Sequence, residues 1–105
     1  MVTRSQRLPA DAFLGKRASK LRSRYFLVKV AGNELAINRF GVVIGKSAAR
    51  LATRRHALKR QILGSLFVKK GGGKDVLIVA QGSLETVTRK QLLDDMKEIK
   101  VFIVS

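Results

Sequence analysis

The hydrophobic residues of this chain fall into short runs separated by basic and glycine-containing segments. Arg24 to Val30 is rich in aromatic and β-branched residues and partly alternates, which predicts a strand ending at the turn-like Ala31-Gly32-Asn33. Glu34 to Asn38 and Phe40 to Ile44 are predicted as the second and third strands. The continuous apolar run from Val76 to Ala80 predicts a strand that is buried on both faces.

Three helices are predicted around these strands. Pro9 opens a short one over Ala10 to Leu14, because proline suits the first turn of a helix. A long helix is predicted to start at Ser47 as its N-cap, with one apolar stripe formed by Leu51, Leu58, Ile62 and Leu66. The last helix opens with the capping-box sequence Thr88-Arg89-Lys90-Gln91, and its inward positions are Leu92, Leu93, Met96 and Ile99.

Together these elements predict a fold of the α+β class, an α/β sandwich with the order α-β-β-β-α-β-α around a four-stranded sheet. A length of 105 residues predicts one domain, residues 1–105, with a single core. The C-terminal residues Lys100 to Ser105 fit two interpretations. Their β-branched content favours an extra edge strand, whereas Ile103 continues the helical stripe.

The charge of the chain is strongly positive and unevenly distributed. The formal net charge is +15 at pH 7. Residues 1–74 hold 18 Lys and Arg against 2 Asp and Glu, whereas residues 75–105 hold 4 against 5, so we expect the C-terminal third to be the structural back of the molecule. This charge favours a nucleic-acid partner. A solvated basic face and an anionic membrane surface are the alternatives, and the second is disfavoured because no long apolar run is present.

The densest positive charge lies on the long predicted helix, where Ala49 to Arg60 contains no acidic residue. Cations that close together repel each other, so we expect a nucleic-acid backbone to neutralise them. The predicted RNA-binding residues are Lys46, Arg50, Arg54, Arg55, His56, Lys59 and Arg60.

Catalytic signals are weak. His56 is the single histidine and lies among cations, while Asp94 and Asp95 point about a hundred degrees apart on a helix, which fits a solvated acidic face. Gly45-Lys46-Ser47 follows a strand as in a phosphate-binding loop, but the first glycine of that motif is replaced by Phe40. We therefore predict no catalytic residue and no metal ligand in this chain. The absence of cysteine and of a signal-peptide core after Met1 favours a cytoplasmic protein.

Aromatic residues in the basic N-terminal half add a second nucleic-acid signal. Phe13, Tyr25, Phe26 and Phe40 either stack on bases of single-stranded RNA or pack in the core. If Tyr25 and Phe26 lie in a strand, they point to opposite faces, so at most one of them lines a given groove.

Several of these segments match one pattern over roughly residues 6–99. Arg7-Leu8 with Phe13, Arg24 to Phe26, Gly41 to Lys46 and Asp75 to Ala80 follow one another as a basic helix, an Arg-x-Phe strand, a glycine-led strand and a Val-x-Ile-x-Ala strand. In this the chain resembles the protein component of bacterial ribonuclease P. The Arg-Asn-Arg-x-Lys-Arg signature of that family falls on Arg55 to Arg60, where Arg55, Lys59 and Arg60 are kept. The chain departs from the family pattern at Lys29, Ser47, His56, Ala57 and Gln61 to Gly64.

The resemblance implies a fold like the second domain of ribosomal protein S5, with a left-handed β-α-β crossover against the usual hand. It implies that the crossover helix binds the catalytic RNA of ribonuclease P, and that a cleft between the first helix and the sheet binds the 5′ leader of precursor tRNA. The cleft residues would be Phe13, Arg17, Arg24 and Phe26. The RNA and Mg²⁺ ions bound mainly by it would supply the chemistry, with this chain as a monomer in the ribonucleoprotein.

Arg55 falls on the apolar stripe by helical phase, so we expect its side chain to extend outward at the junction of the cleft and the RNA-binding face. Arg55→Ala would then lower RNA affinity without unfolding the protein. Three other functions stay open: a small ribosomal or other structural RNA-binding protein, a DNA-binding protein, and an enzyme that is active without RNA.

Overall fold

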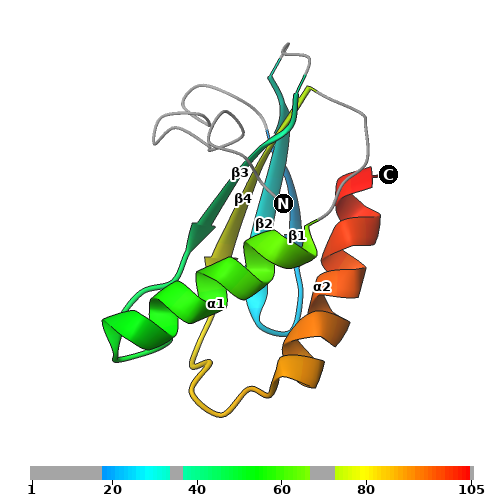
Figure 1. Ribbon diagram of the computed structural model, residues 1–105. Coiled ribbons are helices and arrows are strands. Elements are labelled where there is room, and N and C mark those ends of the chain that lie inside the picture. The colour runs from blue at the N-terminus through cyan, green and yellow to red at the C-terminus, as the bar shows by residue number, and fades with distance from the viewer. Residues whose placement is uncertain (1–17, 34–36, 67–72, 105) are drawn as a thin grey trace.

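The computed structural model describes residues 18–33, 37–66 and 73–104. They form four strands and two helices (Figure 1). In chain order these are β1 (Ser19–Arg22), β2 (Phe26–Gly32), β3 (Arg39–Val43), α1 (Ala52–Ser65), β4 (Lys74–Ala80) and α2 (Arg89–Val104).

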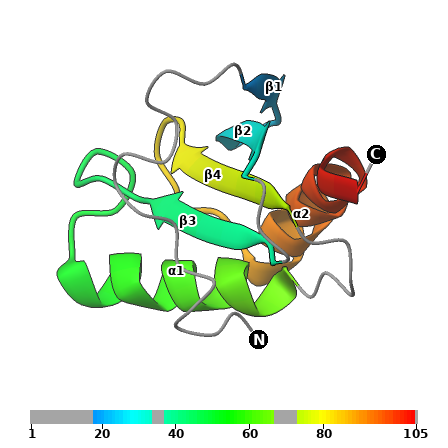
Figure 2. The same ribbon diagram turned by 90° about the horizontal axis from the view of Figure 1, so that it is seen from above.

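The strands form one sheet in the order β1-β2-β4-β3. β1 pairs with β2 and β2 with β4 in antiparallel fashion, whereas β3 and β4 are parallel. A parallel pair needs a crossover connection, and α1 provides it. Followed from β3 through α1 to β4 in Figures 1 and 2, this crossover is left-handed, opposite to the usual hand. The predicted α+β class and four-stranded sheet are confirmed.

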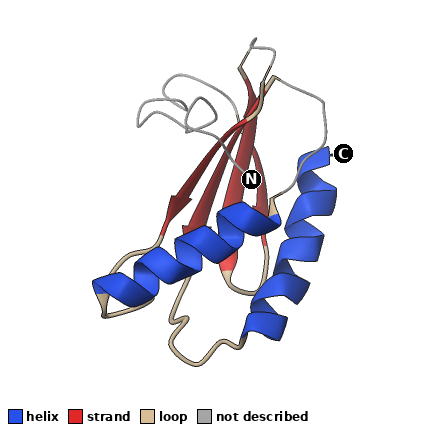
Figure 3. Ribbon diagram, in the orientation of Figure 1, coloured by secondary structure: helices blue, strands red, loops and turns tan. Residues whose placement is uncertain are grey.

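Both helices cover the same face of the sheet (Figures 2 and 3). Because side chains alternate along a strand, every second residue points to this face. The largest buried residues of the layer between sheet and helices are Phe26, Val28, Phe40, Val76 and Ile78 from the strands and Leu58, Ile62, Leu92, Met96, Ile99 and Ile103 from the helices. The opposite face, which we call the open face, carries neither α1 nor α2.

β4 is the strand predicted over Val76 to Ala80, and it lies between β2 and β3. Its predicted burial on both faces is wrong, because Leu77 and Val79 on the open face are only half-buried. Burial therefore alternates from Val76 to Val79 as it does in β2, although this run is uniformly apolar.

One predicted strand is replaced by another. In the strand predicted over Glu34 to Asn38, residues 34–36 lie outside the described residues, and Ile37 and Asn38 are not in a strand. The fourth strand is β1, whose sequence Ser-Lys-Leu-Arg gives little β signal. Pairing with β2 in a hairpin decides its conformation, since an edge strand needs only backbone hydrogen bonds on one side. The helix predicted after Pro9 lies outside the described residues, and so does the start of the predicted element order.

α1 begins later than its sequence predicts. Ser47 is not the N-cap: Leu51 occupies that position without a side-chain capping bond, and the helix starts at Ala52. Leu51 is 69% exposed, so its place in the predicted apolar stripe is also wrong. The reason is tertiary. Ala48 and Ala49 are buried, and both donate backbone hydrogen bonds to the carbonyl of Gly45, so this segment is a packed turn and not helix.

α2 begins as predicted and extends to the end of the described chain. The capping box is present, with Thr88 N donating to Gln91 Oε1 at 2.9 Å and Gln91 N donating to Thr88 Oγ1 at 3.2 Å. The helical alternative for the C-terminal residues is confirmed, because Ile103 is buried in the helical stripe. Lys74 Nζ donates to the carbonyl of Ile103 at 2.6 Å, which satisfies a carbonyl in the last turn of the helix.

Asp95 holds the hairpin between β1 and β2 against α2. Its carboxylate accepts hydrogen bonds from Ser23 Oγ at 2.7 Å and from the backbone N–H groups of Arg24 and Tyr25 at 3.2 Å each. Asp95 is 7% exposed, so the predicted solvated acidic face is wrong for this residue. It fits Asp94, which is exposed and lies 3.7 Å from Lys97.

We expect Asp95→Ala to lower the free energy of unfolding by about 2–3 kcal/mol, because it leaves three donors of the hairpin turn without their acceptor. Urea unfolding followed by circular dichroism measures this change. Asp94→Ala is the matched control, and its unfolding midpoint should stay at the wild-type value, since exposed ion pairs contribute little. Equal midpoints for the two variants would contradict the structural role of Asp95.

Candidate nucleic-acid interface

The predicted RNA-binding residues lie on α1 and on the connection that precedes it. Leu58 and Ile62 form the buried side of the helix. The sequence of the helix contains no acidic residue. Arg54, Arg55 and Lys59 are half-buried at the flanks of that side. The exposed members of the set are Lys46, Arg50, His56 and Arg60. The structure therefore brings all seven residues to one element and its start, which we call the α1 surface.

Two of these arginines also bind backbone carbonyls, Arg55 in the connection before α1 and Arg54 in the segment before α2. Arg55 Nη1 donates to the carbonyls of Ala49 at 3.0 Å and Arg50 at 2.8 Å. Arg54 Nη2 donates to the carbonyl of Val87 at 3.4 Å, in the segment before α2. Arg55 was expected to extend outward beside the cleft. Its guanidinium instead folds back over the backbone before the helix, because the carbonyls there have no helical partners.

The predicted cleft residues are only partly placed by the structure. Phe13 and Arg17 lie outside the described residues. Arg24 is exposed in the hairpin turn, with its guanidinium carbon 5.3 Å from the centre of the Tyr25 ring. Phe26 is wrong as a cleft residue: it has no exposed surface and packs in the core beneath the helices. Because side chains alternate along β2, Phe26 points to the face that the helices cover, opposite the open face.

The strand register reveals cations on the open face that the sequence interpretation missed. Lys20 of β1 is the register partner of Lys29 of β2, which in turn is paired with Leu77 of β4. Arg22 is paired in the same way with Leu27, and Leu27 with Val79. The open face thus has a basic side formed by Lys20, Arg22 and Lys29, next to an aliphatic centre formed by Leu27, Leu77 and Val79.

The pair formed by Lys20 and Lys29 is unfavourable in isolation. Like charges directly opposite each other on neighbouring antiparallel strands destabilise the pairing. Among the described residues the ion pairs of the structure are Arg39 with Asp75 and Lys97 with Asp94, so neither lysine has a carboxylate partner there. An anionic ligand on this face would relieve the repulsion. Both lysines are visible in the sequence, but only the pairing of β1 with β2 shows that they lie opposite each other.

The buried carboxylates of the described chain, Asp75 and Asp95, are already committed to protein contacts. Asp75 is fully buried and forms a two-pronged ion pair with Arg39, with Nε–Oδ1 and Nη2–Oδ2 both at 2.8 Å. Asp75 also accepts a hydrogen bond from Asn33 Nδ2.

No three potential metal-ligand side chains gather in the part of the chain that the structure describes. Neither described helix is long and apolar enough to cross a membrane.

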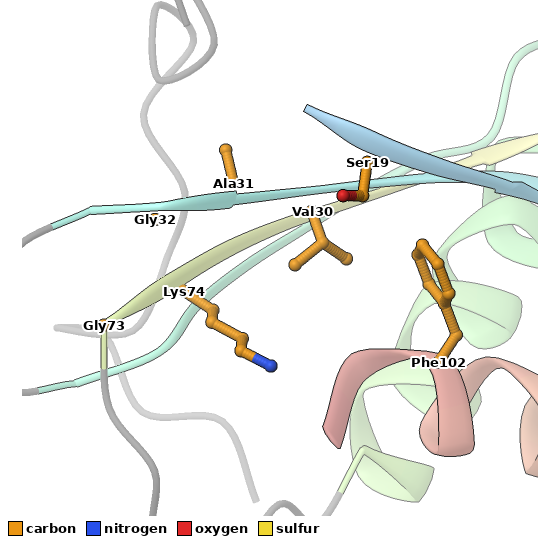
Figure 4. A pocket seen from close by; sticks show the side chains of 7 residues that line it. All are labelled: Ser19, Val30, Ala31, Gly32, Gly73, Lys74 and Phe102. Atoms are coloured by element: carbon orange, nitrogen blue, oxygen red, sulfur yellow. The ribbon is translucent and has the colours of Figure 1, made fainter. Parts of the chain in front are cut away.

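A hollow of about 430 Å³ lies where the ends of β1, β2 and β4 meet the last turn of α2 (Figure 4). The residues that line it are Ser19, Val30, Ala31, Gly32, Gly73, Lys74 and Phe102. The Lys74 amine is bound to the carbonyl of Ile103. We interpret this hollow as a junction between the sheet and α2.

Comparison with known proteins agrees with this geometry. Residues 11–101 match the family model described as Ribonuclease P. The chain belongs to the ribonuclease P protein family. The resemblance found in the sequence is thereby confirmed over most of the chain.

Two curated relatives are each named ribonuclease P protein component. The relative from Halorhodospira halophila (strain DSM 244 / SL1) is 30% identical over 79 residues, which cover 73% of this chain and 65% of the relative. The relative from Ralstonia pickettii (strain 12J) is 42% identical over 62 residues, which cover 57% of this chain and 44% of the relative. The chain therefore spans less than two thirds of the length of either relative.

Solved structures of ribonuclease P proteins share the fold. The protein from Staphylococcus aureus superposes with a TM-score of 0.78 at 22% identity, covering 92% of this chain and 94% of that one. The protein from Thermotoga maritima gives a TM-score of 0.73 at 22% identity, covering 92% and 96%. In this chain the signature positions Arg55 to Arg60 lie on α1, the crossover helix, as the resemblance implied.

We expect Arg55→Ala to lower the free energy of unfolding by about 1–2 kcal/mol, because two backbone carbonyls lose a charged donor. Arg55→Lys should restore part of this loss, since it keeps the charge but lacks the planar guanidinium. Arg60→Ala, an exposed position on the same helix, is the control and should unfold as the wild type does. Thermal unfolding of the three variants measures the effect. Wild-type stability of Arg55→Ala combined with weaker RNA binding would restore the direct-contact interpretation.

Proposed function

We propose that this chain is the protein subunit of ribonuclease P, which binds the catalytic RNA and the 5′ leader of precursor tRNA and assists endonucleolytic removal of that leader. The observation that carries the proposal is the family match over residues 11–101. The presence of two separate basic surfaces supports it, because the protein would have to contact two RNA molecules at once. In this proposal one copy of the chain acts in each ribonucleoprotein, and the complex acts in the cytoplasm.

The α1 surface is suited to the folded RNA subunit. Its exposed helical members, His56 and Arg60, lie on a helix whose buried side is formed by Leu58 and Ile62. Lysine and arginine side chains that neutralise phosphates release counterions, which drives binding to a dense polyanion. Because no acidic residue interrupts the helix, phosphates can approach without a repelling carboxylate.

The open face is suited to a single strand such as the leader. Lys20, Arg22 and Lys29 offer phosphate contacts along one side, while the aliphatic centre beside them offers apolar surface to unpaired bases. Lys29 stands where the family often has a tyrosine, so this protein would rely more on charge and less on aromatic stacking at that position.

Mg²⁺ is proposed to be held mainly by the RNA subunit, where it would activate the attacking water and stabilise the charge of the reacting phosphate. The residues of this chain fit a supporting role. Asp75 and Asp95, the buried carboxylates, are engaged by Arg39 and by the hairpin turn respectively. The surface cations would lower the repulsion between the two RNAs, so the requirement for Mg²⁺ should fall when the protein is bound.

We expect this protein to accelerate leader removal from a 5′-extended precursor tRNA at low Mg²⁺ when it is added to a ribonuclease P RNA, and to cleave nothing alone. Gel analysis of the released leader measures both. The cognate RNA is the decisive partner, because a divergent protein can require its own RNA. Tight RNA binding with no acceleration of the cognate RNA would instead support a structural RNA-binding protein. Cleavage by the protein alone would overturn the proposal.

We expect the double substitution Lys20→Ala with Lys29→Ala to weaken binding of leader-bearing precursor tRNA by the assembled ribonucleoprotein, because it removes two phosphate contacts from the open face. Affinity for mature tRNA, which lacks the leader, should not change. Filter binding of both tRNAs measures the difference, with Lys97→Ala on α2 as the control. An equal loss for both tRNAs would show that these lysines do not contact the leader.

A further inference from the structure

The parallel pairing of β3 and β4 brings two connections to the same end of the sheet. Residues 44–51 lead from β3 into α1, and residues 81–88 lead from β4 into α2. In Figure 1 both helices begin at the lower end of the sheet, where the arrowheads of β3 and β4 point. We call this the connection end.

The two connections are bound to each other. Leu84 N donates to the carbonyl of Ala48 at 2.8 Å, and Arg50 N donates to Glu85 Oε2 at 3.1 Å. The bond from Arg54 to the carbonyl of Val87 adds a third link. Leu84 and Val87 are also buried in the core. The connection end is therefore a single folded unit, and the charges on its two halves are fixed relative to each other.

The charges of this unit continue from α1 onto the start of α2. Lys46 and Arg50 are exposed on the first connection, and Arg89 and Lys90 are exposed in the first turn of α2. Glu85 is the single carboxylate in the sequence of the two connections, and it accepts the backbone N–H of Arg50. Arg89 and Lys90 belong to the C-terminal third, which was expected to be the structural back, but they lie at the basic end of the molecule.

Arg89 and Lys90 do not stabilise α2, the helix to which they belong. The first turn of a helix favours negative charge, and α2 has no acidic residue there. Neither residue forms an ion pair within the described part of the chain. The capping box formed by Thr88 and Gln91 already satisfies the helix start. Two cations at an unfavourable position, directly after a connection that is bonded to the start of the α1 surface, indicate an external anion.

We propose that Arg89 and Lys90 extend the α1 surface across the connection end and contact phosphates of the ribonuclease P RNA subunit. This rests on the proposed function and adds a second element to its RNA interface. A folded RNA is favoured over a protein partner because the described exposed large apolar residues at this end are Val43 and Leu51, whereas a protein interface needs a broader apolar centre.

The test is the salt dependence of RNA binding. Dissociation constants of the full-length protein for the RNA subunit are measured from low to high salt for the wild type and for Arg89→Ala, Lys90→Ala and the double variant. Each lost phosphate contact should reduce the slope of log affinity against log salt by about one and weaken binding uniformly. Lys97→Ala, an exposed cation two turns further along the same helix, is the matched control and should keep the wild-type slope.

Thermal unfolding separates a binding role from a structural one. The double variant should melt at or above the wild-type temperature, because it removes cations from the positive end of the helix. A wild-type slope for the double variant, with a reduced slope for Arg60→Ala on α1, would overturn this inference and leave the proposed function intact. Failure of the wild-type protein to prefer the RNA subunit over an unrelated structured RNA would overturn both.

Discussion

The parallel pairing of β3 with β4 is the constraint on which the rest of this structure depends. Neighbouring parallel strands cannot be joined by a tight turn, so α1 must cross over between them. α2 then packs beside α1 on the same face and completes one apolar layer with the sheet. The functional geometry follows directly: a basic crossover helix outside the core, a sheet face without these helices, and one end where both helices begin.

The charges of the molecule divide into those that hold the fold and those that strain it. Buried Asp75 and Asp95 each tie distant segments together, the first through Arg39 and the second through the hairpin turn. The surface cations do the opposite. Lys20 lies opposite Lys29, and Arg89 and Lys90 occupy a helix start that favours acids. Local rules are broken mainly at functional sites, so this excess of cations supports the RNA partner that we propose.

The candidate interface was predictable from the sequence where charge alone decides exposure. The cations of α1 had to lie on the surface, because Leu58 and Ile62 at helical spacing left one side for burial. Prediction failed where the choice between two faces mattered. Phe26 was assigned to the cleft and is buried under the helices, whereas the lysine at position 29 is on the open face. Alternation divides the side chains of a strand into two sets, one for each face of the sheet. It does not say which of these faces the helices cover.

Local sequence was enough to predict the fold class, the interior strand β4, the capping box of α2 and the basic character of α1, since these follow from local periodicity, capping chemistry and charge density. Tertiary structure alone decided the rest. β1 exists because β2 offers it a backbone to pair with, and Ser47 gives way to Leu51 at the helix start because Ala48 and Ala49 are buried in a turn bound to Leu84. Asp95 looked like a surface group, but it binds the hairpin turn from Ser23 to Tyr25, which is distant in the chain. Such contacts arise only when segments meet in space, and a linear pattern does not contain that information.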